Sequence, residues 1–200
     1  MFARKHNQMT NNNHFHEHKL FENIQYSGKT IRDREFYKCR FVACNFTESD
    51  LRSNNFEACI FEDCNFSMTD VAGVGFRDIS FIGCKILGID FTQCNRFMFS
   101  FRFENCILDY CTFFGPKLDK TIFKKCSLRE VDFTEANLTS SLFTDSDLTG
   151  ALFSNTNLEK TDFRGAANFS IDPEFNKMKN VKFTSFQLEG LLYKYQLDIE

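Results

Sequence analysis

Large apolar side chains recur at every fifth residue through most of this chain of 200 residues. The stretch SLFTDSDLTGALFSNTNLEKTDF places them at Phe143, Leu148, Phe153, Leu158 and Phe163. A helix requires apolar residues about every 3.6 positions, and a half-buried strand requires them at every second position. A period of five fits neither pattern. It predicts instead a chain that turns a corner every five residues, so that four corners close a coil of twenty.

The central residue of each group of five, here called a pentad, is large and apolar along most of the chain. The series runs from Ile31 to Phe91, resumes at Met98 after a slip of two residues, and has weaker members at Phe21 and Tyr26. In the second half Leu and Phe alternate. This alternation predicts two opposite walls of stacked Phe and two of stacked Leu, with coils about 4.8 Å apart that share main-chain hydrogen bonds.

The residue two positions before each central residue is usually small. All nine cysteines occupy this position: Cys39, Cys44, Cys59, Cys64, Cys84, Cys94, Cys106, Cys111 and Cys126. The placement predicts small apolar side chains that face the interior, which is the common role of a free cysteine. Disulfides between stacked cysteines are the alternative, but parallel inward side chains keep their Cβ atoms farther apart than a disulfide prefers. Free thiols favour a reducing, cytoplasmic location.

Two pentads late in the chain also carry a family resemblance. The segments AN-L-TS at Ala136–Ser140 and SD-L-TG at Ser146–Gly150 resemble the A-(D/N)-L-x-x signature of pentapeptide-repeat proteins. The resemblance covers about residues 21–165 and implies an all-β solenoid, a right-handed quadrilateral β-helix. Residues 1–20 are then expected to form a polar N-terminal arm, and residues 166–200 a C-terminal helical cap and dimerisation segment.

The tail after the repeats carries helix signals. Asp172 before Pro173 predicts a helix N-terminus, and a short helix is expected through about Met178. Thr184 and Gln187 have the spacing of a capping box. One apolar stripe follows at i, i+3, i+4 and i+7: Leu188, Leu191, Leu192 and Tyr195.

A solenoid must cover the apolar end of its stack, so the stripe is expected at least to cap the rod. The sharper hypothesis is that it also pairs with the same stripe of a second chain. The tail resembles the C-terminal segment of the gyrase-protecting pentapeptide proteins, the albicidin-resistance, microcin-immunity and Qnr-type quinolone-resistance groups. In those proteins this segment makes a twofold dimer, and the resemblance therefore implies a homodimer through the stripe.

Catalytic and metal-binding patterns are weak. All four histidines precede residue 19, so no His inside the repeats can activate a Ser or Cys nucleophile, and no phosphate-binding Gly loop occurs. His14, His16 and His18 alternate, which in an extended chain would place them on one side as metal ligands. A solvated polar arm is the favoured interpretation. No enzyme activity, cofactor or metal is expected.

Asp50, Asp70 and Asp90 precede central residues twenty positions apart, so they are expected to stack on one outer wall. One account is that each Asp bonds its own turn; the other is that the row imitates DNA phosphates. Residues 41–165 carry 12 basic and 18 acidic groups. Duplex DNA as long as this rod would bear roughly 18 charges, about three times the net charge here.

The slip around TQCNRFMFSFR gathers Arg96, Phe97, Phe99 and Arg102. Two extra residues must form either a packed bulge or a protrusion that contacts a partner. Taken together, these features give the following candidate partner-contacting residues: Asp50, Asp70, Asp90, Arg96, Phe97, Asp132 and Glu135.

The leading functional hypothesis follows from the tail resemblance. It is a cytoplasmic, dimeric protein that binds a type II topoisomerase, DNA gyrase above all, as a DNA mimic and spares it from inhibitors, giving antibiotic resistance or self-immunity. It involves no membrane and no direct contact with nucleic acid. The alternatives are a scaffold with an unrelated protein partner, and a nucleic-acid binder that uses the basic N-terminal arm and the slip.

Overall fold

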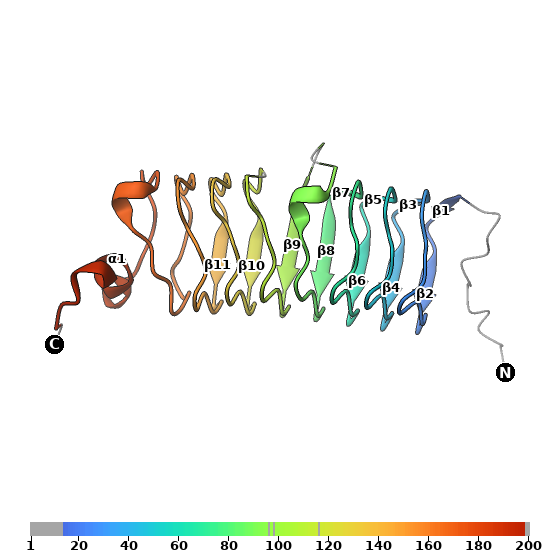
Figure 1. Ribbon diagram of the computed structural model, residues 1–200, viewed down its shortest axis with the longest axis horizontal. Helices are drawn as coiled ribbons and strands as arrows, with labels where there is room; N and C mark the ends of the chain where they lie inside the picture. Colours follow the sequence, from blue (N-terminus) through green and yellow to red (C-terminus); the bar gives the residue numbers. More distant parts are fainter. Residues whose placement is uncertain (1–13, 96, 98, 116, 199–200) are drawn as a thin grey trace.

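The computed structural model describes residues 14–95, 97, 99–115 and 117–198, which form a rod of stacked coils. The first described strand and the C-terminal helix lie at opposite ends of the rod (Figure 1). Strands form two parallel sheets on adjacent sides of the rod, one of four strands and one of seven, and each strand pairs with the strand of the neighbouring coil. No helix in the described ranges combines the length and apolar character needed to cross a bilayer.

The four sides of the coil are called walls 1 to 4 in chain order. Wall 1 contains β1 (Phe15–Glu17), β3 (Glu35–Tyr37), β5 (Asn55–Glu57) and β7 (Gly75–Arg77). Wall 2 contains β2 (Leu20–Glu22), β4 (Arg40–Val42), β6 (Ile60–Glu62), β8 (Ile79–Ile82), β9 (Phe101–Glu104), β10 (Ile122–Lys124) and β11 (Leu142–Thr144).

Single parallel bridges connect the coils elsewhere. Wall 3 runs through Gln25, Asn45, Asn65, Lys85, Ile107, Ser127, Asp147 and Ala167. Wall 4 runs through Thr30, Asp50 and Asp70, and then through Asp90, Thr112, Asp132 and Leu152. Wall 1 continues beyond its strands through Lys117, Asn137, Asn157 and Lys177.

Central residues stack on their equivalents one coil away. Phe36 aligns with Phe56, and their rings lie 4.8 Å apart and nearly parallel at 7°. Rings on adjacent walls meet edge to face, as Phe36 and Phe41 do at 5.4 Å and 70°. Both arrangements are favourable for aromatic pairs. The predicted quadrilateral β-solenoid is therefore confirmed, with its large residues inside.

The small inward position is used for hydrogen bonding as well as for packing. All nine cysteines are buried free thiols, and most point toward a carbonyl of the preceding coil, as Cys59 does toward Phe36 O at 3.4 Å. Burial raises the pKa of the Cys111 thiol to about 12, so it stays protonated and can donate. Where Ser141 stands at this position, its hydroxyl donates to Leu118 O at 2.7 Å.

The slip inserts its two residues between walls 1 and 2. β8 and β9 pair with Phe81 opposite Phe103, a spacing of 22 residues instead of 20. Phe101 is buried, and Phe99 packs edge-on against it at 4.4 Å. Phe97 instead remains 70% exposed. The insertion thus has a packed base and an exposed ring, and the expected central residue Met98 lies outside the described residues.

The N-terminal end of the rod begins earlier than the expected boundary at residue 21. β1 forms the first rung of wall 1, because His16 takes the inward central position with a side chain 2% exposed and stacked on Phe36 at 4.9 Å. His14 and His18 are exposed. The alternative in which the three imidazoles share one side does not hold, because only His16 points inward, while His14 precedes β1 and His18 lies at a corner (φ 50°).

Acidification is expected to loosen this first coil. Burial, together with Lys19 and Arg34, lowers the pKa of His16 to about 4, and no group in the described chain bonds its Nε2. Because this folded-state pKa lies below the unfolded value of about 6.5, the stabilisation is complete above pH 6.5 and falls as the pH drops toward 4, by up to about 3 kcal/mol. Amide exchange at Glu35, which bonds His14 O, measures this opening.

The matched control for this prediction is His16→Phe, which continues the ring column of wall 1. In this variant the amides of the first coil should exchange slowly, and their rates should follow only the pH dependence of intrinsic amide exchange. Equal pH dependence in the two proteins would show that His16 does not control the opening.

The C-terminal tail is helical but more broken than expected. Asp172 caps a single 3₁₀ turn, Pro173–Phe175, instead of a helix reaching Met178. A second 3₁₀ turn (Ser185–Gln187) leads into α1 (Glu189–Leu192) and a third turn (Tyr193–Tyr195). The Thr184 N–H donates to Gln187 Oε1 at 2.9 Å, which is part of the expected capping box.

Gly190 explains why the tail can close the rod. Its carbonyl accepts a hydrogen bond from Ile171 N–H at 2.9 Å, and a Cβ at this position would collide with Phe169. Glycine destabilises an isolated helix, but here the absence of a side chain allows the helix to approach the last coil closely. The predicted C-terminal helical cap is confirmed, although it is shorter than a continuous amphipathic helix.

Candidate functional site: the acidic wall

Wall 4 gathers most of the predicted partner-contacting residues. Asp50 and Asp70 are bridged directly, and Asp132 lies two rungs from Asp90, with Thr112 between them. Glu135 follows at the corner of the same coil as Asp132, with φ at 59°. Among the other candidates, Phe97 lies beyond wall 4, near Arg77 of wall 1 at 5.9 Å. Arg96 lies outside the described residues.

The carboxylates of wall 4 each complete their own turn. Asp70 accepts the Ala72 N–H at 3.0 Å, and Asp132 accepts the Thr134 N–H at 2.8 Å. Asn45 and Asn137 accept the equivalent bonds on walls 3 and 1, at 3.0 and 3.1 Å. The turn therefore requires an acceptor oxygen but no charge, so the negative charge of wall 4 is not explained by the fold alone.

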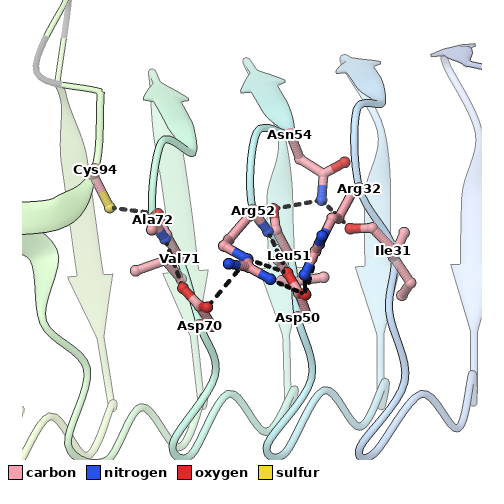
Figure 2. A network of polar contacts seen from close by, with 10 residues as sticks. All are labelled: Ile31, Arg32, Asp50, Leu51, Arg52, Asn54, Asp70, Val71, Ala72 and Cys94. Atoms are coloured by element: carbon pink, nitrogen blue, oxygen red, sulfur yellow. Dashed lines mark hydrogen bonds and ion pairs between the residues drawn. The ribbon is translucent and has the colours of Figure 1, made fainter.

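Two arginines neutralise the N-terminal part of the wall (Figure 2). Arg52 lies between two carboxylates, 2.9 Å from Asp50 Oδ2 and 3.3 Å from Asp70 Oδ2. Arg32 contacts the same Asp50 oxygen. Half-exposed pairs of this kind contribute at most about 1 kcal/mol each. Their main effect is that Asp50 and Asp70 present little net charge to a partner.

The C-terminal part of wall 4 differs, because its carboxylates have no cationic partner among the described residues. We call Asp90, Asp132 and Glu135 the acidic strip. The outward positions of wall 4 from 90 to 155 carry no Lys or Arg. Phe114 and Leu152 lie on the same wall, 41% and 56% exposed. The strip thus combines unpaired negative charge with accessible apolar side chains.

Phe114 and Leu152 were not among the residues predicted from the sequence. Both occupy outward pentad positions, which are mostly polar elsewhere. A large apolar residue outside the central position is therefore the sequence signal that identifies them. Aromatic side chains, Phe included, are enriched in protein interfaces relative to the rest of the surface.

The inner side of wall 4 is fixed by Asn54, whose side chain is fully buried and contacts the backbone of the neighbouring segments (Figure 2). Its amide donates to Ile31 O at 2.6 Å and to Leu51 O at 2.7 Å. Its oxygen accepts the Arg34 N–H at 2.9 Å. One side chain thus satisfies three backbone groups at the corner between walls 4 and 1, which holds two successive coils in register.

The C-terminal cap exposes a second apolar surface. Of the four residues of the expected dimerisation stripe, Leu191 packs against the core, whereas Leu188, Leu192 and Tyr195 are 46%, 36% and 54% exposed. Phe186 next to them is 96% exposed. A groove of about 600 Å³ lies between this helix and the segment Ala166–Ser170.

Lys194 ties the cap to the last coil. Its Nζ lies 2.9 Å from Asp172 Oδ2 and 2.9 Å from Glu174 Oε2. These two carboxylates raise the pKa of Lys194 above its usual range. Within the described ranges, no three His, Cys, Asp or Glu side chains gather closely enough to hold a metal ion.

Comparisons with known proteins agree with this architecture. A family model described as pentapeptide repeats (8 copies) matches residues 36–67 and 59–95, and one described as a pentapeptide repeat region matches 97–163 and 117–193. No curated protein sequence matches the chain significantly.

Solved structures with the same fold include two trypsin-treated variants of QnrB1, a plasmid-mediated fluoroquinolone resistance protein. Both are 21% identical to this chain with a TM-score of 0.53; the alignments cover 94% and 93% of this chain and 98% and 99% of theirs. HetL of the cyanobacterium Nostoc sp. strain PCC 7120, involved in heterocyst differentiation regulation, aligns at 13% identity and a TM-score of 0.45, covering 86% of this chain and 88% of its own.

Proposed function

Because the chain belongs to the pentapeptide repeat family, we propose that it is a non-catalytic binding protein that protects a type II topoisomerase, DNA gyrase above all. In this proposal wall 4 occupies the surface on which the enzyme binds DNA. The protein thereby competes with the cleaved DNA complex that an inhibitor would trap. The chain itself performs no reaction, and its effect depends on affinity and shape.

The acidic strip is the observation that carries this proposal. Asp90 and Asp132 need no charge to complete their turns, yet both are charged, and no cation of the described chain pairs with them. A DNA-binding surface is basic, so it would supply the missing partners and would raise the association rate through long-range attraction. Phe114 would add a desolvated anchor within the same contact.

A supercoiling assay tests the proposal. Purified gyrase is titrated with the full chain in the presence and absence of a fluoroquinolone, and supercoiled and cleaved DNA are measured. We expect fewer cleaved complexes at protein concentrations that leave supercoiling active. A titration that changes neither supercoiling nor the response to the inhibitor would contradict the proposal.

The tail resemblance and the exposed cap also support a homodimer, in which the exposed stripe of one chain covers that of a second. The variant Leu188→Asp, Leu192→Asp is then expected to be monomeric, because each introduced carboxylate would have to be buried unpaired. Analytical ultracentrifugation measures the change. The matched variant Leu20→Asp, Leu142→Asp alters exposed residues of wall 2 and should leave the dimer intact.

A protein-interaction scaffold with an unrelated partner is the second candidate. It is favoured by the neutralisation of Asp50 and Asp70 by arginines, which makes wall 4 less like DNA over half of its length. Under this alternative, gyrase would not bind, while the exposed Phe114 and Leu152 would still contact a partner.

A further inference from the structure

Walls 1 and 2 carry a concentration of lysines in the C-terminal half of the rod. From 117 to 182 their outward positions hold nine basic residues and four acidic ones: Lys117, Lys120, Lys124, Lys125, Lys160, Arg164, Lys177, Lys179 and Lys182, with Asp119, Asp145, Glu159 and Asp162. Glu104 pairs with Lys124 at 2.7 Å, and Asp162 pairs with Arg164.

Six of these lysines are exposed, and their side chains make no ion pair or hydrogen bond within the described chain. We call them the lysine corner: Lys117, Lys120, Lys125, Lys160, Lys177 and Lys179. Along the stack, Asn137 and Asn157 separate Lys117 from Lys177, and Ser140 separates Lys120 from Lys160. The corner is therefore a solvated cationic surface whose charge is not consumed by the fold.

The lysine corner forms two groups along the rod axis. The first group is Lys117, Lys120 and Lys125, which belong to one coil. The second group is Lys160, Lys177 and Lys179. Wall 1 passes from Lys117 through Asn137 and Asn157 to Lys177, three rungs away. At about 4.8 Å per rung, the two groups lie roughly 10 to 14 Å apart. This separation is comparable to the major-groove width of B-form DNA, about 12 Å.

We propose that the lysine corner binds the phosphate backbone of duplex DNA. Two cationic groups at this separation can contact phosphates on both sides of one groove, and each neutralised phosphate releases counterions. On walls 1 and 2 from 117 to 182, no aromatic side chain is exposed, so unstacked bases of a single strand find no platform. The corner also presents only lysine ammonium groups, which contact phosphates without reading base sequence.

This activity is separate from the protection of a topoisomerase and does not rest on it. In the coil order, wall 2 lies opposite wall 4. A rod whose acidic strip is covered by a protein partner therefore still exposes part of the lysine corner. The inference departs from the expectation of no direct nucleic-acid contact, because the lysines converge only when the coils close.

Fluorescence anisotropy with the full chain and a labelled duplex of about 30 base pairs, without any topoisomerase, tests this inference between about 50 and 200 mM salt. We expect weak, sequence-independent binding, with a slope of log affinity against log salt of roughly −3 to −5. The variant Lys117→Gln, Lys120→Gln, Lys160→Gln should bind at least about tenfold more weakly at the lowest salt.

The matched control is Lys29→Gln, Lys38→Gln, Lys85→Gln, which removes the same charge from exposed positions in the N-terminal half. Its affinity should stay within about twofold of the parent. Equal losses in the two variants would overturn the assignment. So would undetectable duplex binding at the lowest salt, tighter binding of a single strand, or binding to phosphatidylserine vesicles in place of DNA.

Discussion

Replacing Phe123 with alanine is expected to lower the free energy of unfolding by about 3 to 5 kcal/mol. The ring is fully buried and stacked between Phe103 and Phe143, at 5.3 and 4.9 Å. It also meets Phe133 edge-on at 5.8 Å. Its removal leaves a cavity that the neighbouring coils cannot fill without losing their shared hydrogen bonds. Urea denaturation followed by circular dichroism measures the loss.

Each coil of a solenoid contacts only its neighbours, so the loss of packing should be confined to the coils next to Phe123. The matched control is Ile122→Ala, one residue earlier in β10, where the side chain faces outward. It should cost less than about 1 kcal/mol. Equal losses for the two substitutions would mean that the central residues do not line the interior.

Removing the charge of wall 4 without changing its turns is the second prediction with a large expected effect. In the variant Asp90→Asn, Asp132→Asn, Glu135→Gln, the two new Asn side chains still accept the turn N–H, as Asn45 and Asn137 already do. Stability should therefore change by less than about 0.5 kcal/mol. Affinity for gyrase, measured by surface plasmon resonance, should fall at least about tenfold, mainly through slower association.

The control Asp63→Asn, Asp119→Asn, Asp145→Asn removes three exposed carboxylates from walls 1 and 2. It should bind gyrase as the parent does. If both variants keep full affinity, the Asp column only completes turns, and recognition by charge is excluded. If both lose affinity equally, overall net charge matters and wall 4 is not a specific contact.

Most of the interior of this protein could be predicted from its sequence because one rule places nearly all of its central residues. A period of five identified the buried Phe, Leu and Cys positions, and it placed Asp50 and Asp70 on one wall. Short-range patterns therefore suffice where each coil repeats the last. The exceptions arise at the slip, where Phe101 is buried outside the period, and at the ends of the stack, where His16 replaces a Phe and Gly190 allows the cap to approach Phe169.

Surface pairing was harder to predict, since partners on neighbouring coils are distant in the sequence. Arg32 and Asp50, Arg52 and Asp70, and Arg129 and Asp147 are all 18 residues apart. This spacing equals one coil less two residues, and it becomes meaningful only once the coil length is known. The neutralisation of wall 4 near Asp50 and the convergence of the lysine corner therefore emerged from the structure.

The central functional claim is that wall 4 and DNA compete for one surface of gyrase. The most direct test is an equilibrium titration of gyrase with the fluorescently labelled chain, with and without saturating duplex DNA. The Lys117→Gln, Lys120→Gln, Lys160→Gln variant is used so that DNA binds the rod itself much more weakly. The account predicts binding that DNA abolishes competitively. Binding that persists unchanged at saturating DNA, or no binding to gyrase at all, would contradict it.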